Sequence, residues 1–247
     1  MGRLKIAALQ VLSLALLGLV WEVVSRLRLV DPLFVPPPTA VVSAMGAVFS
    51  QALPRLGDTF LKTLGGYAVA VVLGVALGLL IGSLHTLRQA TMPYVVALFS
   101  LPKILIIPWI VLILGVKAQA AILSGALFAF FPVLVLVIGG VRDVEPILIT
   151  AATSMGASRW QLYQKVIVPA ALPAILVGMR VGVVFALVGV LLTEMFAGIR
   201  GMGFLMQQLA VAFNATHLFA ATALVSVFSI LVVLWLDNLN QRLGKWR

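Results

Sequence analysis

Three charged residues lie within or beside long apolar stretches of the sequence: Lys103, Arg180 and Glu194. A charge in the hydrocarbon core of a membrane is costly unless it is paired or hydrated, so such residues often mark a functional site. Arg180 and Glu194 are fourteen residues apart, which returns them to nearly the same helix face. That face can line a cavity or a subunit interface. The alternative is that each charge pairs with a neighbouring helix or extends to the membrane surface, and for Lys103, beside a helix break, this alternative is preferred.

The residues needed for catalysis are not grouped in this sequence. It has no cysteine, so disulfides and thiolate metal sites are excluded. His85 and His217 fall at loop boundaries without metal-ligand spacing, and no two acids share an apolar segment. The G-x-x-x-x-G-K-[ST] loop that binds ATP phosphates is missing as well. We therefore expect a chain that is not an enzyme and binds no cofactor of its own.

The composition indicates an integral membrane protein. Of 247 residues, 63% are hydrophobic and 10% are charged, with a mean hydropathy of +1.20. Soluble domains have roughly 45–50% apolar and about 25% charged residues, so lipid must be the solvent for much of this chain. The net charge of +10 is carried by short segments between apolar runs. That pattern is typical of topology signals beside anionic lipid rather than of a nucleic-acid site.

Six segments are long and apolar enough to cross a membrane as helices, which predicts an all-α protein with one transmembrane domain over residues 1–247. They cover about residues 6–24, 64–84, 93–114, 118–140, 172–197 and 218–236, with the core spans inside 64–240. A cleaved signal peptide is the alternative for the first segment, but it passes through Trp21 and Glu22 without a small-residue cleavage site. Pro102 and Pro108 predict a kink or break in the third.

A proline-rich segment over 31–60 separates the first two spans. Pro36, Pro37 and Pro38 end any preceding helix, and Thr39 can cap a new one over 40–52. That helix is too short to span, so we expect an amphipathic helix at the membrane surface, on the periplasmic side.

Positive charges indicate the orientation. Six spans put both termini and the segments 85–88 and 142–165 on one side, which collects Arg3, Lys5, Arg88, Arg142, Arg159, Lys165, Arg242, Lys245 and Arg247. The other side carries Arg26, Arg28, Arg55, Lys62, Lys117 and Arg200. Since cytoplasmic loops are enriched in Lys and Arg, both termini are predicted to be cytoplasmic.

Small residues form two stripes along the predicted spans. One consists of Gly66, Ala70, Gly74, Gly78 and Gly82, each four residues after the last, and the other of Gly178, Gly182 and Gly189. Such stripes let helices approach closely in lipid. Ordinary helix packing accounts for both; the functional alternative is that these helices slide or part to open a pathway.

The polar segment over 141–169 is the longest between spans in the second half of the chain. Residues 150–169 read TAATSMGASRWQLYQKVIVP. Gly156 permits a sharp turn or close approach, Ser158 is suited to an N-cap, and Pro169 can open the next span. The pattern predicts two short helices joined at Gly156 on the cytoplasmic face, where they can transmit a push from a soluble partner.

This segment resembles the "EAA" loop of ABC importer permeases. The resemblance rests on Ala151-Ala152, Gly156, and Val166, Val168 and Pro169, while Thr150 replaces the usual acid. Further similar elements are the proline-rich approach to Thr39, LPKILIIPWIVLILG over 101–115, GMR at 178–180 and EMFAGIRGMG over 194–203. The set is similar to the subgroup that handles nitrate, sulfonates, taurine, bicarbonate and related small solutes.

The resemblance implies a type I importer permease of the bacterial inner membrane. Its partners would be a second permease copy (or a sister permease), two ATP-binding subunits that hold ATP and Mg, and a periplasmic or lipid-anchored substrate-binding protein. The ATPase-coupling residues would be Ala151, Ala152, Gly156, Ala157, Ser158 and Trp160. The pathway or dimer interface would include Gly74, Gly78, Gly82, Arg180, Gly182 and Glu194. The positive balance and Arg180 suit an anionic solute; the alternative is that these charges are topology signals. An ion-coupled secondary transporter is the alternative function.

Overall fold

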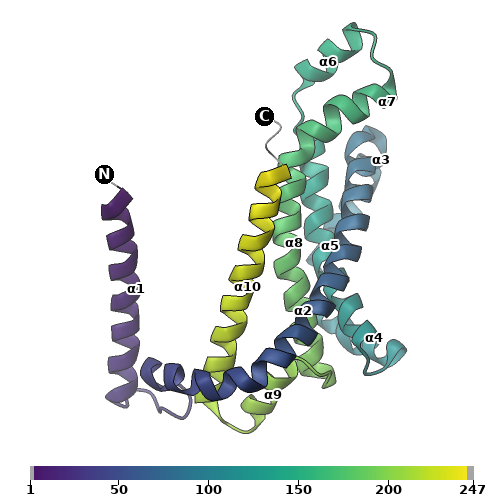
Figure 1. The fold of residues 1–247 in the computed structure, drawn as a ribbon. Coiled ribbons are helices and arrows are strands. Elements are labelled where there is room, and N and C mark those ends of the chain that lie inside the picture. Colours follow the sequence, from purple (N-terminus) through teal and green to yellow (C-terminus); the bar gives the residue numbers. More distant parts are fainter. Residues whose placement is uncertain (1–2, 244–247) are drawn as a thin grey trace.

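The computed structural model describes residues 3–243, and this part of the chain is helical without strands (Figure 1). The long helices are α1 (Arg3–Arg26), α2 (Pro38–Ser83), α3 (His85–Ser100), α5 (Ala118–Arg142), α8 (Val168–Ala197) and α10 (Ala215–Leu243). The shorter elements are the 3-10 turn η1 (Lys103–Ile106), α4 (Ile107–Leu114), α6 (Pro146–Ser154), α7 (Arg159–Leu162), the π-helical turn η2 (Tyr163–Ile167) and α9 (Met202–Val211). The predicted all-α fold is confirmed.

Among the described residues, five helices are long and apolar enough to cross a membrane, and the number is six if a bent pair of helices counts as one span. In that pair α3 meets η1 and α4 at an angle of 80°, so the third span is broken next to Pro102 as predicted. Lys103 lies at this break. Its Nζ donates to the Phe99 carbonyl at 2.8 Å and lies 4.6 Å from the centre of the Phe99 ring. Lys103 therefore caps the end of α3, in line with its preferred structural role.

One sequence prediction about the helices is wrong. The surface helix over 40–52 and the span over 64–84 are not separate, because α2 runs unbroken for 46 residues with Pro54 inside it. Thr39 does not cap α2 either; its hydroxyl donates to Glu22 at 2.8 Å, and α2 starts after Pro37 without a side-chain cap. Figure 1 shows the first part of α2 crossing one end of the bundle before the helix turns along it.

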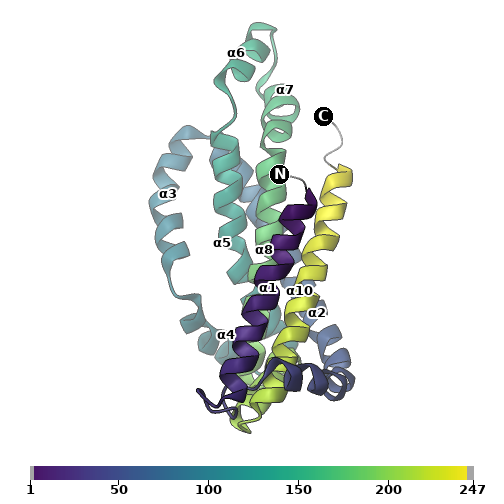
Figure 2. The same ribbon diagram turned by 90° about the vertical axis from the view of Figure 1, so that its left-hand side faces the viewer.

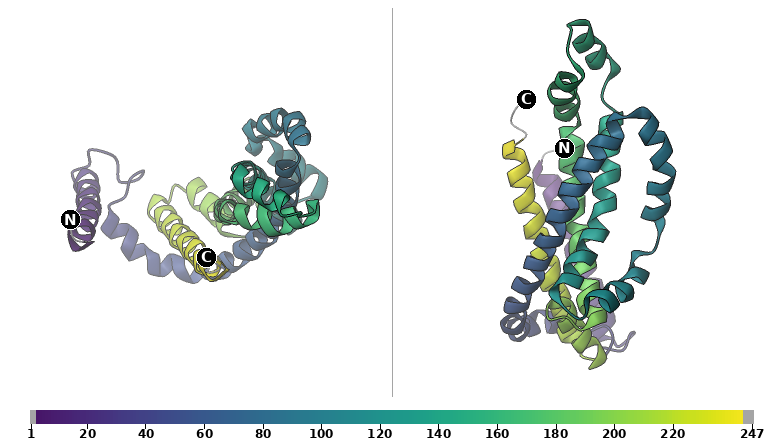
Figure 3. Two further views of the ribbon diagram at one scale, coloured as in Figure 1. Left: turned by 90° about the horizontal axis from the view of Figure 1, so that it is seen from above. Right: turned by 90° about the vertical axis from the view of Figure 1, so that its right-hand side faces the viewer.

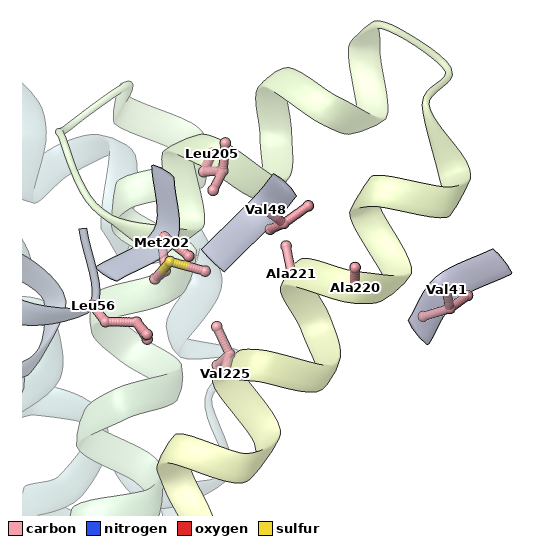
Figure 4. Close-up of a cluster of buried hydrophobic side chains, with 9 residues drawn as sticks. Val41, Val48, Leu56, Met202, Leu205, Ala220, Ala221 and Val225 are labelled. Atoms are coloured by element: carbon pink, nitrogen blue, oxygen red, sulfur yellow. The ribbon is translucent and has the colours of Figure 1, made fainter. Parts of the chain in front are cut away.

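Packing explains why α2 continues through Pro54. Its first half buries Val41, Val48, Ala52 and Leu56 at helical spacing, against the start of α9 and the start of α10 (Figure 4). The cluster also contains Met202, Leu205, Ala220, Ala221 and Val225. A proline removes one backbone hydrogen bond, but this apolar contact on both sides of it holds the helix together.

Both ends of the described chain lie at the same end of the bundle as α6 and α7, as Figures 2 and 3 show. We call this the terminal end, and the opposite end, with α9 and the first part of α2, the distal end. The arrangement agrees with the predicted grouping of the termini with the segment 142–165. Of the cations counted for the orientation, Lys245 and Arg247 lie outside the described residues.

The centre of the bundle is α5, which packs between α2 and α8. The stripe of small residues makes this contact close: a Cβ atom added to Gly74, Gly78 or Gly82 would lie 2.7–2.9 Å from Val133, Val137 or Val141 on α5. On the other side, a Cβ at Gly182 would lie 2.7 Å from Val133. The short distances between α5 and its two neighbours thus require glycine at these four positions.

Candidate functional site

The segment between α5 and α8 projects beyond the helical bundle. Figure 1 shows α6 and α7 standing clear of the spans at the terminal end. No residue from Glu145 to Ala170 is buried. The two short helices predicted from the sequence are present, with their junction at Gly156.

The turn at Gly156 is a left-handed helix cap. Gly156 has φ +80°, its N–H donates to Thr153 O, and Ala157 N–H donates to Ala152 O, both at 3.0 Å. This pair of bonds is the Schellman motif that closes a helix at a glycine. A Cβ at Gly156 would meet nothing within 4 Å, so the glycine is needed for its backbone angle rather than for close approach within the chain.

Ser158 caps α7 as predicted. Its hydroxyl accepts from Gln161 N–H at 3.3 Å, while the Gln161 side chain accepts from Ser158 N–H at 2.9 Å. These two bonds form a capping box. After α7 the chain passes through η2 directly into α8, so Arg159–Ala197 is one helical rod of 39 residues. α7 and α8 are therefore parts of one continuous helix.

The projecting segment presents apolar side chains to its surroundings. Ile147 is 67% exposed, Met155 87% and Trp160 65%, and the Trp160 ring stacks on Tyr163 with centres 5.9 Å apart. Thr150, at the usual acidic position, is exposed, and its hydroxyl donates to its own helix at Pro146 O. Exposed aromatic and thioether groups on a rigid protrusion are typical of a docking surface for another protein.

The predicted pathway residues fall into two groups. Gly74, Gly78, Gly82 and Gly182 are buried against α5 of the same chain, which is ordinary helix packing; their assignment to a pathway or dimer interface stays a prediction. Glu194 is also completely buried within the chain, where Lys62 Nζ lies 2.8 Å from its Oε1. The structure thus places Glu194 away from any open face.

Arg180 is the exception, since its side chain is 52% exposed on α8. Its neighbours on that face, Val177 and Val184, are exposed and apolar. The guanidinium pairs with Asp237 of α10: Nε donates to one carboxylate oxygen at 2.5 Å and an NH2 group to the other. Such two-point contact is the strong geometry of arginine with a carboxylate. Arg180 and Glu194, predicted to share a face, have separate partners at different heights of the bundle.

Sequence reasoning missed the partners of both charges. Lys62 was counted only as a topology signal, and Asp237 and Thr59 were not considered. The available signal was the position of Lys62 and Asp237 at the edges of the spans predicted over 64–84 and 218–236, because a charge next to an apolar span favours a partner of opposite sign. Among the described residues, no group of three or more His, Asp or Glu side chains could hold a metal.

Comparison with known proteins identifies the class. Residues 70–245 match the family described as binding-protein-dependent transport system inner membrane component, and this chain belongs to that family. It is 31% identical over 241 residues to the taurine transport system permease protein TauC of Escherichia coli, covering 95% of this chain and 88% of TauC. It is 26% identical to the putative aliphatic sulfonates transport permease protein SsuC of Bacillus subtilis, covering 92% and 83%. The formylaminopyrimidine transport permease protein ThiX of Halalkalibacterium halodurans is 27% identical, covering 94% and 93%.

Solved structures support the same fold. An inward-facing structure of the MetNI methionine ABC transporter superposes with a TM-score of 0.68 at 21% identity, covering 77% of this chain and 94% of that one. An amino acid ABC transporter gives a TM-score of 0.55 at 18% identity, with 83% and 95% covered. The chain is a multi-pass permease subunit of an ABC importer, a transport component and not an enzyme. This assignment replaces the alternative of an ion-coupled secondary transporter.

Proposed function

We propose that two copies of this chain form the pathway of an ATP-driven importer in the bacterial inner membrane. The solute is small and anionic and is delivered by a periplasmic or lipid-anchored binding protein. Two ATP-binding subunits, which hold ATP and Mg, dock on α6 and α7, and the terminal end faces the cytoplasm. The observation that carries the proposal is the exposed segment over 145–170, whose second part, from Arg159 on, continues without a break into α8.

Several features of the segment suit contact with an ATPase. Trp160 and Met155 are exposed apolar side chains that can become buried anchors in a groove of the ATP-binding subunit. The Gly156 turn fixes the angle between α6 and α7 without a flexible linker. Attachment to α5 at one end and α8 at the other lets a push on this segment reach two central helices. Ala151, Ala152 and Ala157 keep the surface around the turn small, so that a partner can approach the backbone.

The anionic solute is proposed from the charge of Arg180 and from the relatives named for taurine and sulfonates. An arginine on an apolar membrane helix does not face lipid without cost, so its half-exposed guanidinium is best placed toward a second copy or a hydrated pathway. When no solute is bound, Asp237 holds the guanidinium of Arg180. An anion that enters the pathway would compete with Asp237 for the same donors.

The test begins with purification of the chain from its native membrane in mild detergent, followed by reconstitution in liposomes with the co-purified ATP-binding subunit and binding protein. We expect ATP hydrolysis to rise when the loaded binding protein is added, and solute uptake to require ATP. Uptake driven by an ion gradient without ATP would contradict the proposal.

The solute class is tested with Arg180→Gln and the matched control Arg26→Gln, which removes an exposed arginine near the distal end of α1. Removing a charge-assisted bond costs about 1.5–3 kcal/mol, so we expect uptake of a sulfonate to fall about tenfold or more in Arg180→Gln alone. Equal uptake in both variants would show that Arg180 does not contact the solute.

A further inference from the structure

The distal end of α8 is tied to α2 and to the start of α9 by a buried polar cluster that the proposed function does not use. Thr59 and Lys62 lie on α2, Glu194 lies on α8, and the loop 198–201 leads from α8 into α9. Glu194 is completely buried, Thr59 is 1% exposed and Lys62 is 8% exposed. We call Thr59, Lys62, Glu194 and the 200–203 backbone the distal clamp.

Both oxygens of the Glu194 carboxylate are used. The Thr59 hydroxyl lies 3.0 and 2.9 Å from them, Lys62 Nζ donates to Oε1 at 2.8 Å, and Gly203 N–H donates to Oε2 at 3.0 Å. The loop is held from the other side as well. Lys62 Nζ donates to the Arg200 carbonyl, and Met202 N–H donates to the Thr59 hydroxyl at 2.9 Å. The clamp thus joins three segments through one carboxylate.

The two glycines of the loop fit the backbone around this carboxylate. A Cβ at Gly201 would overlap the Glu194 carboxylate, and a Cβ at Gly203 would overlap the Leu191 carbonyl and lie 2.8 Å from Glu194 Cβ. Outside the buried cluster, the Arg200 guanidinium lies 2.9 Å from the Asp58 carboxylate and adds a second link between the loop and α2. The loop can therefore not separate from α8 or α2 without breaking several buried bonds together.

The position of the clamp gives it a mechanical consequence. Arg159 of the coupling segment and Glu194 stand 35 residues apart on one helical rod, a distance of about 50 Å at 1.5 Å per residue. A displacement of α7 reaches the distal end as motion of Glu194. There, the groups that hold Glu194 form the buried polar link by which the motion passes to α2 and α9, beside the direct packing of α8 on both helices.

We propose that the distal clamp is a transmission joint that makes α2, the end of α8 and α9 move as one rigid unit, so that ATP-driven motion of the coupling segment rearranges the distal surface. Glu194 and Lys62 are positioning residues in this role and do not contact the solute. The inference rests on the proposed function. The comparison of variants therefore requires a wild-type complex that shows ATP-dependent uptake. A wild-type complex without such uptake would refute the proposed function rather than the joint.

The test measures ATP hydrolysed per solute imported by the complete transporter in liposomes. Glu194→Ala alone would leave the Lys62 charge buried without a partner, so the variant is Lys62→Ala with Glu194→Ala, which removes both charges. We expect the ATP cost per solute to rise about tenfold, within the range typical of coupling between distant sites. The matched control is Glu22→Ala with Arg26→Ala, an ion pair at the same end that lies outside the clamp and has side chains 17% and 64% exposed; it should leave the ratio unchanged. An unchanged ratio in Lys62→Ala with Glu194→Ala would overturn the inference.

A reversible rescue separates transmission from a role in folding. The hydrogen bond between Thr59 and Met202 puts their Cα atoms within about 7 Å, the limit for a disulfide. The chain has no native cysteine, so Thr59→Cys with Met202→Cys introduces the sole thiol pair. In the uncoupled variant, oxidation of this pair should restore the wild-type ratio and reduction should abolish the rescue. Two results would overturn the rigid joint: a formed disulfide that leaves the variant uncoupled, or a disulfide that blocks transport in a chain that retains Lys62 and Glu194.

Discussion

The most direct prediction concerns the turn at Gly156, where three substitutions separate backbone strain from contact with a partner. Gly156 has φ +80° and open space around its α-carbon. An alanine or leucine in left-handed backbone costs about 1–2 kcal/mol, whereas asparagine adopts this conformation readily. The backbone strain is therefore the same in Gly156→Ala and Gly156→Leu, and it is small in Gly156→Asn.

The size of the effect follows from that strain. A cost of about 1 kcal/mol lowers the population of the native turn relative to alternatives about fivefold, and about 2 kcal/mol lowers it about thirtyfold. No atom of the chain lies within 4 Å of the added Cβ, so the spans themselves should remain folded. What changes is the angle at which α6 and α7 meet, and with it the surface offered to the ATP-binding subunit.

The assay is stimulation of ATP hydrolysis by the loaded binding protein in the reconstituted complex. We expect Gly156→Leu to abolish stimulation. If strain alone matters, Gly156→Ala should lose as much and Gly156→Asn little. If the partner approaches the turn closely, loss should follow side-chain size instead. Stimulation at the wild-type level in Gly156→Leu would refute the assignment of this segment to coupling.

Three further predictions concern packing, capping and docking. Gly78→Val places an isopropyl group against Val137 of α5, from which its Cβ alone would lie 2.7 Å, and should destabilise the chain by about 1–3 kcal/mol in thermal unfolding in detergent. Gly46→Ala, at an open helical position, should not destabilise it. Ser158→Ala removes the cap of α7, costs about 1 kcal/mol and should speed hydrogen exchange of the α7 amides about fivefold, without change in α8. Trp160→Ala should weaken binding of the ATP-binding subunit by about 2 kcal/mol in a titration, whereas Tyr94→Ala, an equally exposed aromatic on α3, should have no effect.

Local chemistry explains which features could be predicted from the sequence. The number of spans follows from apolar length, and the break at Pro102 from the missing N–H and the ring of proline. The Gly156 turn and the Ser158 cap depend on residues within a few positions of each other, so the sequence contains all of the information. These features were the ones predicted correctly.

The unbroken α2 could not be predicted in this way. A proline and a moderate apolar content near residue 54 favour a break when only neighbours are considered. The stabilising contacts come from Met202 and Ala221, about 150 residues or more further along the chain. Their effect depends on how α9 and α10 fold back on the distal end, which local propensity does not describe.

The partners of the charges in the spans could not be predicted from the sequence for a similar reason. A membrane charge predicts that a partner exists but not where it lies, since the partner must be near in space and not in sequence. Lys62 and Glu194 are 132 residues apart, and Arg180 and Asp237 are 57 apart. The first pair is buried and its hydrogen bonds fix a loop, while in the second pair Arg180 is half-exposed and its guanidinium bonds only to Asp237. Burial thus separates the pair that we propose as a structural joint from the pair that we propose as an anion site. The variants of the two pairs should fail in different ways: Lys62→Ala with Glu194→Ala in the ATP spent per solute, and Arg180→Gln in the solute accepted.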